Sequence, residues 1–576
     1  MDEPHRHDLP RRPLLAGGRL RAAAHRHAFL PPPHPHPRSE GVTLVDTIVI
    51  GARVRSLAPE TAEGADAIAI ADGRITAVGP RAEILPLAEA GTELITHPEA
   101  TIIPGLVDGH SHPVYSLGIV RGLSLTGVHT YAELLAALER GRDDQAGEEW
   151  FLAWGLDPTA FEGRPIGNAA LHEVLGADRP AYIKMFDAHS GIASAAALAR
   201  AGIDAPVSHP DGSGAAGDED GNLTGHVIEF PTMEIVERAL PALHFADRVA
   251  QLHRLLSDMA AVGITAAHVM DLQDDDALDL LAAIEASGDL PVRLRISPWV
   301  TPETTDAEVA ALIEMQGRGG RRYRVEGVKF FIDGTVEGGT AWLSHPDAEG
   351  EGLSSAWTPA EAYAERVRQF DRAGVPTATH AIGDRGIRFV AETLAALPQG
   401  GPTHRIEHIE SAEDDVIALI GASGIVASMQ PTHCTHHVRR DGSDDWSRRL
   451  GAERAGRAWR TADVRRSGAV LALGSDWPVA AFDPWEIMAD ARGRRSVAVA
   501  GSAPVGPEQA LTAAEALEGY TTHAHRAVAS DGGRLVPGAP ADLLVIDRDP
   551  LEASPEELLR TRVLLTLVDG EPTARR

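Results

Sequence analysis

The sequence predicts a (β/α)₈ TIM barrel, an α/β fold, with an insertion after its first strand and a small β-sandwich domain formed by both chain ends. Three observations predict it: apolar strand-like runs that end in polar or ionisable residues, helix-like stretches between most of them, and short alternating strands at both ends of the chain. Eight such runs alternating with helices are typical of this barrel. In chain order the runs are 103–112, 263–270, 291–299, 327–333, 375–380, 404–410, 424–430 and 469–476.

The barrel is expected to occupy residues 104–530, interrupted by the insertion at about 113–262. Without the insertion, residues 104–112 and 263–490 come close to the roughly 250 residues typical of this barrel. The insertion has a strand-like run of its own at 180–189. Insertions after barrel strands lie on the active-site face, so this one is expected to cover the pocket, to form a lobe with an aromatic core, or to do both.

The two ends of the chain carry the β-rich segments, 43–103 and 531–576. Apolar and polar residues alternate there around turn signals such as Asp72-Gly73, which predicts hairpins. We therefore expect one small β-sandwich assembled from both ends. Residues 1–42 differ, because they hold eight of the 39 prolines and six of the 26 histidines, and they are expected to form a disordered Pro/His/Arg-rich tail.

Composition excludes several classes of protein. The formal net charge is −30, whereas binding to nucleic acid or to an anionic membrane requires a basic face. No run of about 18 apolar residues exists that would predict a membrane span. The single cysteine, Cys434, excludes an intramolecular disulfide framework and Cys-based structural zinc sites. We expect a cytoplasmic protein.

Histidine and aspartate residues at the strand ends predict a metal site. The first run ends in His110-Ser111-His112, and residues i and i+2 of a strand point to the same side, so both imidazoles can bind one ion. Imidazole and carboxylate ligands suit zinc, with manganese or iron as alternatives. A barrel brings all its strand ends to one rim, and the later runs add Lys329, His380, His408 and Asp476.

Lys329 is one of only two lysines in the chain, Lys184 being the other, against 51 arginines. GC-rich coding explains the bias, but a lysine that persists under it can have a role that arginine cannot fill. An arginine stays charged, whereas a lysine amine can lose its proton and react. A neutral lysine is a poor zinc ligand and a protonated one repels the ion, so Lys329 needs a chemical explanation.

Short blocks along the chain resemble a known family. They are PGLVDGHSH, GITAAHV, GVKFFIDGT, THAIGD, RIEHIE, ASMQPTH, LGSDWPV and GAPADLLVID. In type and order they resemble the amidohydrolase superfamily, and within it the amidohydrolase-3 or YtcJ-like group, over most of residues 44–570. The resemblance implies a metal-dependent (β/α)₈ barrel and a small β-sandwich made from both chain ends, in agreement with the pattern of strands.

The resemblance also implies a ligand set for two divalent metal ions, with zinc expected. His110, His112 and Asp476 would bind the more buried ion, and His380 and His408 the second. Lys329 would be N-carboxylated by CO₂ and bridge the two ions, a modification that arginine cannot undergo. His433, in the QPTH block, would contact the substrate.

The function predicted from this resemblance is metal-dependent hydrolysis of a non-peptide C–N bond in a small amide, formamide or N-acyl compound, with Asp476 as the catalytic general base and then acid. The expected partner is this small amide-like molecule, with no nucleic acid and no membrane; a homodimer is considered because barrel enzymes of this type are often dimers. One alternative is a mononuclear nucleobase-like deaminase, although such enzymes usually have a glutamate three residues after the fifth-strand histidine and position 383 here is glycine. The other alternative is a non-catalytic scaffold with the same fold.

Three further residues receive weaker assignments. Asp333 and Glu410 lie near ligand-bearing strands, and we expect them to orient histidines by hydrogen bonding. Lys184 matches no ligand position, and a structural role or a place on the surface of the insertion is preferred for it.

Overall fold

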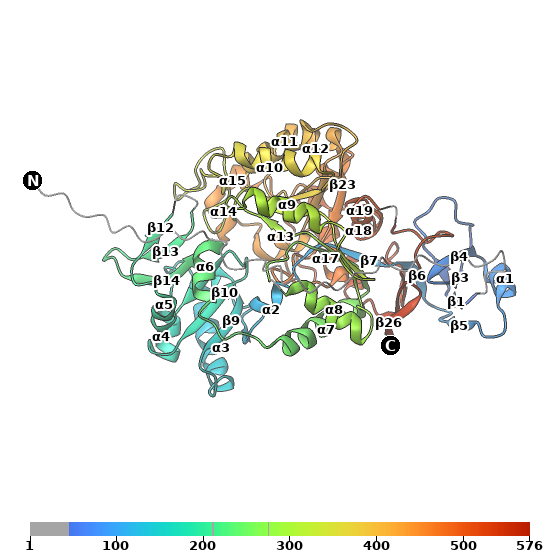
Figure 1. Ribbon diagram of the computed structural model, residues 1–576, viewed down its shortest axis with the longest axis horizontal. Coiled ribbons are helices and arrows are strands. Elements are labelled where there is room, and N and C mark those ends of the chain that lie inside the picture. Colours follow the sequence, from blue (N-terminus) through green and yellow to red (C-terminus); the bar gives the residue numbers. More distant parts are fainter. Residues whose placement is uncertain (1–44, 210–211, 275, 531, 576) are drawn as a thin grey trace, which may run out of the picture.

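The computed structural model describes residues 45–209, 212–274, 276–530 and 532–575. The predicted tail, residues 1–42, lies outside the described residues, and the domain boundaries stay a prediction. The insertion lies at one end of the long axis of the molecule and the sheets formed by the chain ends lie at the other, with the parallel strands between them (Figure 1).

Two all-parallel sheets form the centre of the molecule, and each predicted run contains a strand of one of them. The first sheet has the order β18-β16-β15-β7, and the second has the order β17-β19-β20-β21-β22-β23. The strands of the first sheet are β7 (Leu106–Ser111), β15 (Ile264–Val269), β16 (Arg293–Ile296) and β18 (Tyr323–Val325). Those of the second are β17 (Trp299–Val300), β19 (Val328–Phe331), β20 (Thr377–Ala381), β21 (Arg405–His408), β22 (Val426–Met429) and β23 (Val470–Leu473).

The two sheets meet at two places. The third run is divided between β16 and β17 at Pro298, which has no N–H to donate to a sheet ladder. The fourth run contains β19, and β18, which belongs to the other sheet, lies just before that run. At the other meeting point, an isolated parallel bridge joins Ser111 to Trp477, just after β23. The first run was predicted too long, because Gly105 separates β7 from a strand that pairs in the small β domain.

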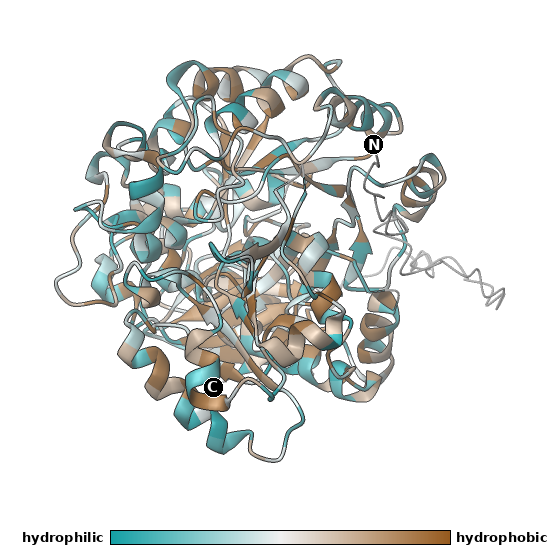
Figure 2. Ribbon diagram, turned by 90° about the vertical axis from the view of Figure 1, so that its left-hand side faces the viewer, coloured by the Kyte–Doolittle hydropathy of each residue, from teal (hydrophilic) through white to brown (hydrophobic). Residues whose placement is uncertain are grey.

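Helices between the strands cover the outer faces of these sheets. In α10 (Glu361–Arg372) the buried residues are Tyr363, Ala364, Val367 and Phe370, which share one face at helical spacing. The Phe330 ring of β19 lies 5.4 Å from Tyr363 and 5.9 Å from Phe370, so this face packs on the sheet. The central strands are mostly apolar, whereas the surrounding helices mix apolar and polar residues (Figure 2).

Seven further helices lie between or after these strands along the chain. They are α7 (Phe245–Ala261), α8 (Ala277–Ser287), α9 (Asp306–Met315), α11 (Asp384–Ala395), α12 (Asp414–Ser423), α16 (Thr461–Arg466) and α17 (Pro484–Gly493). Among the described residues, no helix combines the length and the apolar content that crossing a bilayer requires.

Strands of the N-terminal segment form a four-stranded sheet, β4-β3-β1-β5, and strands from both chain ends form a five-stranded sheet, β2-β6-β24-β25-β26. They are β1 (Thr47–Ile50), β2 (Arg53–Val54), β3 (Ala67–Ala71), β4 (Arg74–Gly79), β5 (Glu93–Thr96), β6 (Thr101–Pro104), β24 (Leu543–Ile546), β25 (Val563–Val568) and β26 (Glu571–Arg575). One apolar cluster, which includes Val49, Ile68, Leu543 and Leu565, joins the two sheets. Asp72 and Gly73 both have positive φ, 49° and 72°, as the predicted hairpin turn requires.

The insertion contains a seven-stranded sheet with the order β12-β13-β14-β11-β10-β9-β8, where the sequence pattern indicated one strand. The strands are β8 (Leu123–Ser124), β9 (Phe151–Leu156), β10 (Ala181–Met185), β11 (Ser190–Ala193), β12 (Val207–Ser208), β13 (Gly214–Gly217) and β14 (Leu223–Ile228). Its helices include α3 (Tyr131–Asp144), α4 (Ala169–Leu175), α5 (Ala195–Ala201) and α6 (Glu229–Glu237). Phe151 and Ile183 belong to an apolar core within this lobe, so it has the structural role that the sequence allowed.

Lys184 connects the insertion to the loop after β7. Its side chain is only 4% exposed, and its Nζ lies 2.6 Å from Glu237 Oε1 and 3.2 Å from the Tyr115 hydroxyl oxygen. Burial by itself lowers the pKa of Lys184, but the charge of Glu237 and the Tyr115 hydroxyl raise it above its ordinary value. The second lysine is therefore a buried structural cation, in line with the preferred assignment.

Replacing Lys184 with Met should destabilise the protein, because it leaves the Glu237 carboxylate without its cation. We expect the free energy of unfolding to fall by a value on the order of 2 kcal/mol, below the roughly 3–5 kcal/mol of a fully buried pair, since Glu237 is 25% exposed. The measurement is the midpoint of thermal unfolding. The double variant Lys184→Met/Glu237→Gln should recover part of the loss, and an unchanged midpoint in the single variant would contradict the assignment.

Candidate metal centre and its pocket

The predicted ligands lie at the carboxyl ends of the parallel strands. His110 is in β7, Lys329 in β19 and His380 in β20, while His408 is the last residue of β21 and Asp476 follows β23. Parallel pairing of β19 with β20 and of β20 with β21 places these ends side by side. The topology thus gathers residues that are far apart in the sequence.

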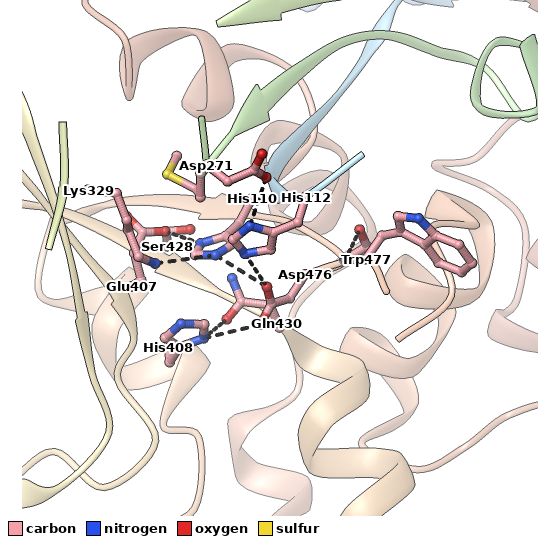
Figure 3. A network of polar contacts seen from close by, with 12 residues as sticks. His110, His112, Asp271, Lys329, Glu407, His408, Ser428, Gln430, Asp476 and Trp477 are labelled. Atoms are coloured by element: carbon pink, nitrogen blue, oxygen red, sulfur yellow. Dashed lines mark hydrogen bonds and ion pairs between the residues drawn. The ribbon is translucent and has the colours of Figure 1, made fainter. Parts of the chain in front are cut away.

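Asp476 is the centre of the cluster (Figure 3). Its Oδ1 lies 3.3 Å from His110 Nε2 and 3.1 Å from His112 Nε2, and its Oδ2 lies 3.9 Å from His408 Nδ1. Lys329 Nζ lies 3.4 Å from His110 Nε2. His110, His408 and Asp476 each offer a ligand atom within 4.8 Å of the others, and all three are buried.

His380 and His433 complete the group. The His380 ring lies 4.5 Å from that of His408, measured between centroids, and its Nε2 lies 3.1 Å from the Gly334 carbonyl oxygen. His433, in α13 (Pro431–His437), has its Nε2 3.8 Å from Asp476 Oδ2, and this buried nitrogen has no hydrogen-bond partner among the described residues. The structure therefore brings together all seven residues that the sequence singled out.

Three residues that the sequence reasoning missed orient the histidines. Glu407 Oε2 lies 2.5 Å from His110 Nδ1, and Asp271 Oδ2 lies 3.1 Å from His112 Nδ1. Gln430 Oε1 lies 2.9 Å from His408 Nδ1. Glu407 could have been identified from the sequence, because it is a charged residue inside a strand-like run, RIEH.

The predicted orienting residues, Asp333 and Glu410, have other roles. Asp333 accepts hydrogen bonds from the backbone N–H groups of Trp342, Ile382 and Gly383, and its Oδ1 is 3.8 Å from His380 Nε2, beyond hydrogen-bond distance. Glu410 accepts from Trp446 Nε1 at 2.8 Å. Both assignments were wrong because proximity in sequence to a ligand does not fix the direction of a side chain.

The donor set fits a divalent cation. When Nδ1–H of His110, His112 and His408 donates to Glu407, Asp271 and Gln430, each Nε2 keeps its lone pair for a metal ion. Nitrogen and carboxylate oxygen donors converging in this way suit zinc. The backbone is strained here as well, since His408 and Asp476 have φ of 73° and 59°, which costs a non-glycine residue about 1–2 kcal/mol. Strain of this kind is concentrated at functional sites.

The protonation states of Asp476 and His408 agree with metal binding. Burial raises the pKa of Asp476, but the charges of His110 and His408 and the hydrogen bonds of His110 and His112 outweigh burial and hold it well below its ordinary value. Burial, together with the charge of His380, lowers the pKa of His408 well below its ordinary value. Burial also lowers the pKa of Lys329 to about 8, although the charges of Glu407 and Asp476 oppose it. At neutral pH Asp476 is thus anionic and His408 neutral. Burial lowers the pKa of His112, but the hydrogen bonds and charges of Asp271 and Asp476 outweigh burial and raise it to about 9, so His112 has to release a proton when it binds a cation.

A pocket of about 740 Å³, a volume that includes open solvent at its mouth, surrounds this cluster. The insertion contributes residues 186–189 to its lining, so the lobe also covers the pocket, the other role expected for it. His189 lies in the wall with its Nδ1 2.9 Å from Glu229 Oε2, and His437 stacks on Phe186 at 3.9 Å. Aromatic side chains form part of the lining, among them Tyr115, Phe230, Trp299 and Phe331.

The fold and the convergent donors define a metal-dependent hydrolase. The model of the amidohydrolase family matches residues 99–574, and the chain therefore belongs to that family. The chain is similar to N-substituted formamide deformylase of Arthrobacter pascens, with 25% identity over 91% of this chain and 97% of that one. It is also similar to the putative amidohydrolase YtcJ of Bacillus subtilis, with 24% identity over 89% and 96%.

A solved structure has the same fold. It is an uncharacterised metal-dependent hydrolase of Pyrococcus horikoshii, with a TM-score of 0.67 and 24% identity, covering 88% of this chain and 99% of that one. The predicted membership of the amidohydrolase family, including the YtcJ-like group, is confirmed.

Replacing Glu407 with Gln should weaken metal binding, because His110 loses the carboxylate that fixes its ring. We expect roughly a 10- to 100-fold lower metal affinity, measured by titration with a competing chelator. Glu413→Gln is the control, since that glutamate is 40% exposed and pairs with Arg388 outside the pocket. Equal affinities in the two variants would show that Glu407 does not orient a ligand.

Proposed function

We propose that this protein hydrolyses a non-peptide C–N bond of a small amide, formamide or N-acyl compound, using two divalent cations held at the carboxyl ends of a closed barrel. The observation that carries the proposal is the single buried cluster of His110, His112, His408 and Lys329 around Asp476, with His380 beside it. The similarity to a relative named for formamide deformylation supports the choice of bond.

In this proposal His110, His112 and Asp476 hold one cation, and His380 and His408 hold the other. Zinc is the expected metal, since the donors are imidazole nitrogens and a carboxylate. When bound, the cations supply Lewis acidity and lower the pKa of a water molecule.

As its carbamate, Lys329 would supply an anionic oxygen ligand to the two cations. The neutral Nζ amine forms a bond to the carbon of CO₂ and releases one proton, which gives an anionic oxygen ligand. Burial supports this step, because a pKa of about 8 leaves more of the amine neutral than the ordinary value of 10.5 does. The modification also explains a lysine at this position in a chain that has 51 arginines.

Asp476 moves the proton of the reaction. Its carboxylate accepts a proton from the attacking water and then donates it to the leaving nitrogen. Its Oδ1 lies 3.3 Å from His110 Nε2 and 3.1 Å from His112 Nε2, so a cation shared with these two histidines would hold the carboxylate in place. His433 Nε2 lies 3.8 Å from the same carboxylate and has no other partner among the described residues, so it is positioned to bind the substrate.

The two alternatives have less support. A deaminase of the mononuclear type would have a glutamate at position 383, but a Cβ on Gly383 would lie 2.2 Å from the Trp342 carbonyl oxygen, so no side chain fits there. A scaffold that had lost catalysis would lack part of the ligand cluster, whereas all six predicted ligands are gathered here.

Metal counting and a substrate panel test the proposal. The protein as purified should contain two divalent cations per chain and should hydrolyse a member of a panel of formamides, small amides, N-acyl amino acids and cyclic ureides. Lys329→Arg should contain one cation or none and be inactive, because a guanidinium cannot form the carbamate. Wild-type protein that is reloaded with metal in the absence of bicarbonate should likewise bind fewer than two cations and be inactive. A metal-replete, fully active Lys329→Arg variant would refute the proposal.

Asp476→Asn should lower kcat far more than it changes KM, because the amide keeps the shape of the side chain but accepts no proton. We expect a loss in kcat of about 10²- to 10⁴-fold. The metal content of the variant separates loss of a ligand from loss of the base. Wild-type kcat in a variant that retains both cations would exclude Asp476 as the proton acceptor.

A further inference from the structure

A second cavity lies next to the metal pocket. Its volume is about 910 Å³, which includes open solvent at its mouth. The two cavities have four lining residues in common, which are His189, Phe230, Trp299 and Phe331. The residues assigned to the metal centre line the first cavity and not the second. The four shared rings are therefore the partition between the metal pocket and the second cavity.

Three rings of the partition contact one another and the metal centre. The Phe230 ring centroid lies 5.1 Å from that of Trp299 and 5.6 Å from that of Phe331, and the last two are 4.9 Å apart. The Phe331 ring lies 5.4 Å from the ring of His380, and Lys329 Nζ lies 5.0 Å from the Phe331 centroid. The second cavity thus begins one aromatic ring away from the candidate metal ligands.

Phe230 is the part of the partition that can move aside. Trp299 is fixed, because its indole N–H donates to the Met270 carbonyl oxygen at 2.6 Å, and Phe331 belongs to the internal strand β19. Phe230 is half-buried, comes from the insertion and has no hydrogen-bonding group that could fix its ring. The residue before it, Glu229, has a φ of 61°, and backbone strain of this kind is concentrated at ligand-binding and switch segments.

The carboxylates deep in the second cavity are already hydrogen-bonded within the protein. Asp333 accepts from three backbone N–H groups. Glu229 Oε1 accepts from the Thr340 hydroxyl at 2.7 Å, and its Oε2 contacts the histidine of the partition. Glu234 Oε2 accepts from the Arg238 guanidinium at 2.8 Å. A molecule in this cavity is therefore not needed to satisfy these groups.

Between these carboxylates the lining is apolar. Besides the aromatic rings of the partition, it includes Pro231, Val300, Pro302 and Ala356. Two further lining residues, Gln273 and Glu303, are exposed and mark the end that opens to solvent. Cavities of this size with aromatic and aliphatic walls bind apolar groups, which gain free energy by leaving water.

We propose that the second cavity binds an alkyl or aryl group of the substrate, attached to the amide that lies at the metal centre, and that the Phe230 ring turns aside to admit it. The inference rests on the proposed function and narrows its substrates to amides with a large apolar substituent. An amide without such a group occupies the metal pocket alone.

A series of straight-chain hydroxamic acids, from acetohydroxamic to octanohydroxamic acid, tests the proposal through binding to the metal-loaded protein. The hydroxamate head group binds divalent cations, so the chain extends from the metal centre. Once the chain reaches the second cavity, each added methylene should raise the affinity roughly threefold, measured by calorimetry. A crystal structure of the octanohydroxamate complex should show the chain in the second cavity and the Phe230 ring displaced.

Two variants that fill the second cavity separate it from the metal pocket. Ala356 and Thr301 line the second cavity and not the first. Ala356→Phe and Thr301→Phe should each lower the ratio of octanohydroxamic to acetohydroxamic affinity by roughly fivefold or more, because the chain loses the apolar space. Ala88→Phe is the matched control, since Ala88 is also half-buried but packs against the four-stranded sheet, outside both cavities. The midpoint of thermal unfolding identifies any variant that does not fold.

No gain in affinity with chain length, a gain that the folded filled variants retain, or a chain that lies outside the second cavity in the crystal would each overturn the proposal. The binding readout does not depend on turnover. A gain that the filled variants lose, in a protein that hydrolyses no amide, would keep the apolar site and refute only the hydrolase function. Amide hydrolysis by a protein whose filled variants keep the gain would refute only the apolar site.

Discussion

The structure depends on the concentration of charged and polar ligand groups around Asp476 in the interior of the protein. Burying an anion next to several imidazoles and a lysine is costly unless each group has a hydrogen-bond partner or a metal ion. The surrounding residues supply the partners: Glu407, Asp271 and Gln430 each accept from a histidine. Arg405 in turn holds Glu407 at 2.5 Å, so the network extends into the strands themselves.

This network depends on parallel strands with irregular ends. Parallel pairing brings the carboxyl ends of β19, β20 and β21 to one edge, where their last side chains meet. His408 and Asp476 then adopt positive φ, a strain that the packed sheet below them supports. Rigid strands therefore hold the ligands, whereas loops and the insertion shape the space above them.

The insertion has two structural roles: it forms an apolar core of its own, and it lines part of the pocket. Its aromatic residues alone did not show which of these roles it has. Phe151 and Ile183 form its own core, while residues 186–189 reach the pocket. Lys184 lies between these two parts and ties the lobe to Tyr115, which lines the pocket close to His112. The pocket is thus lined in part by segments outside the strands, including Asp187 of the insertion and Glu337 of the loop after β19.

The sequence by itself determined the parallel strand runs, the hairpin at Asp72-Gly73 and the residues that gather at the centre, because periodicity and the chemistry of histidine, aspartate and lysine are local properties. Only the tertiary structure decided which groups orient them. Asp333 and Glu410 were expected to do so, yet Asp333 binds backbone N–H groups and Glu410 binds Trp446. The seven-stranded sheet of the insertion and the lining of the pocket likewise arise from contacts between distant segments. Such contacts leave no periodic signal in the chain, since they depend on how the elements pack.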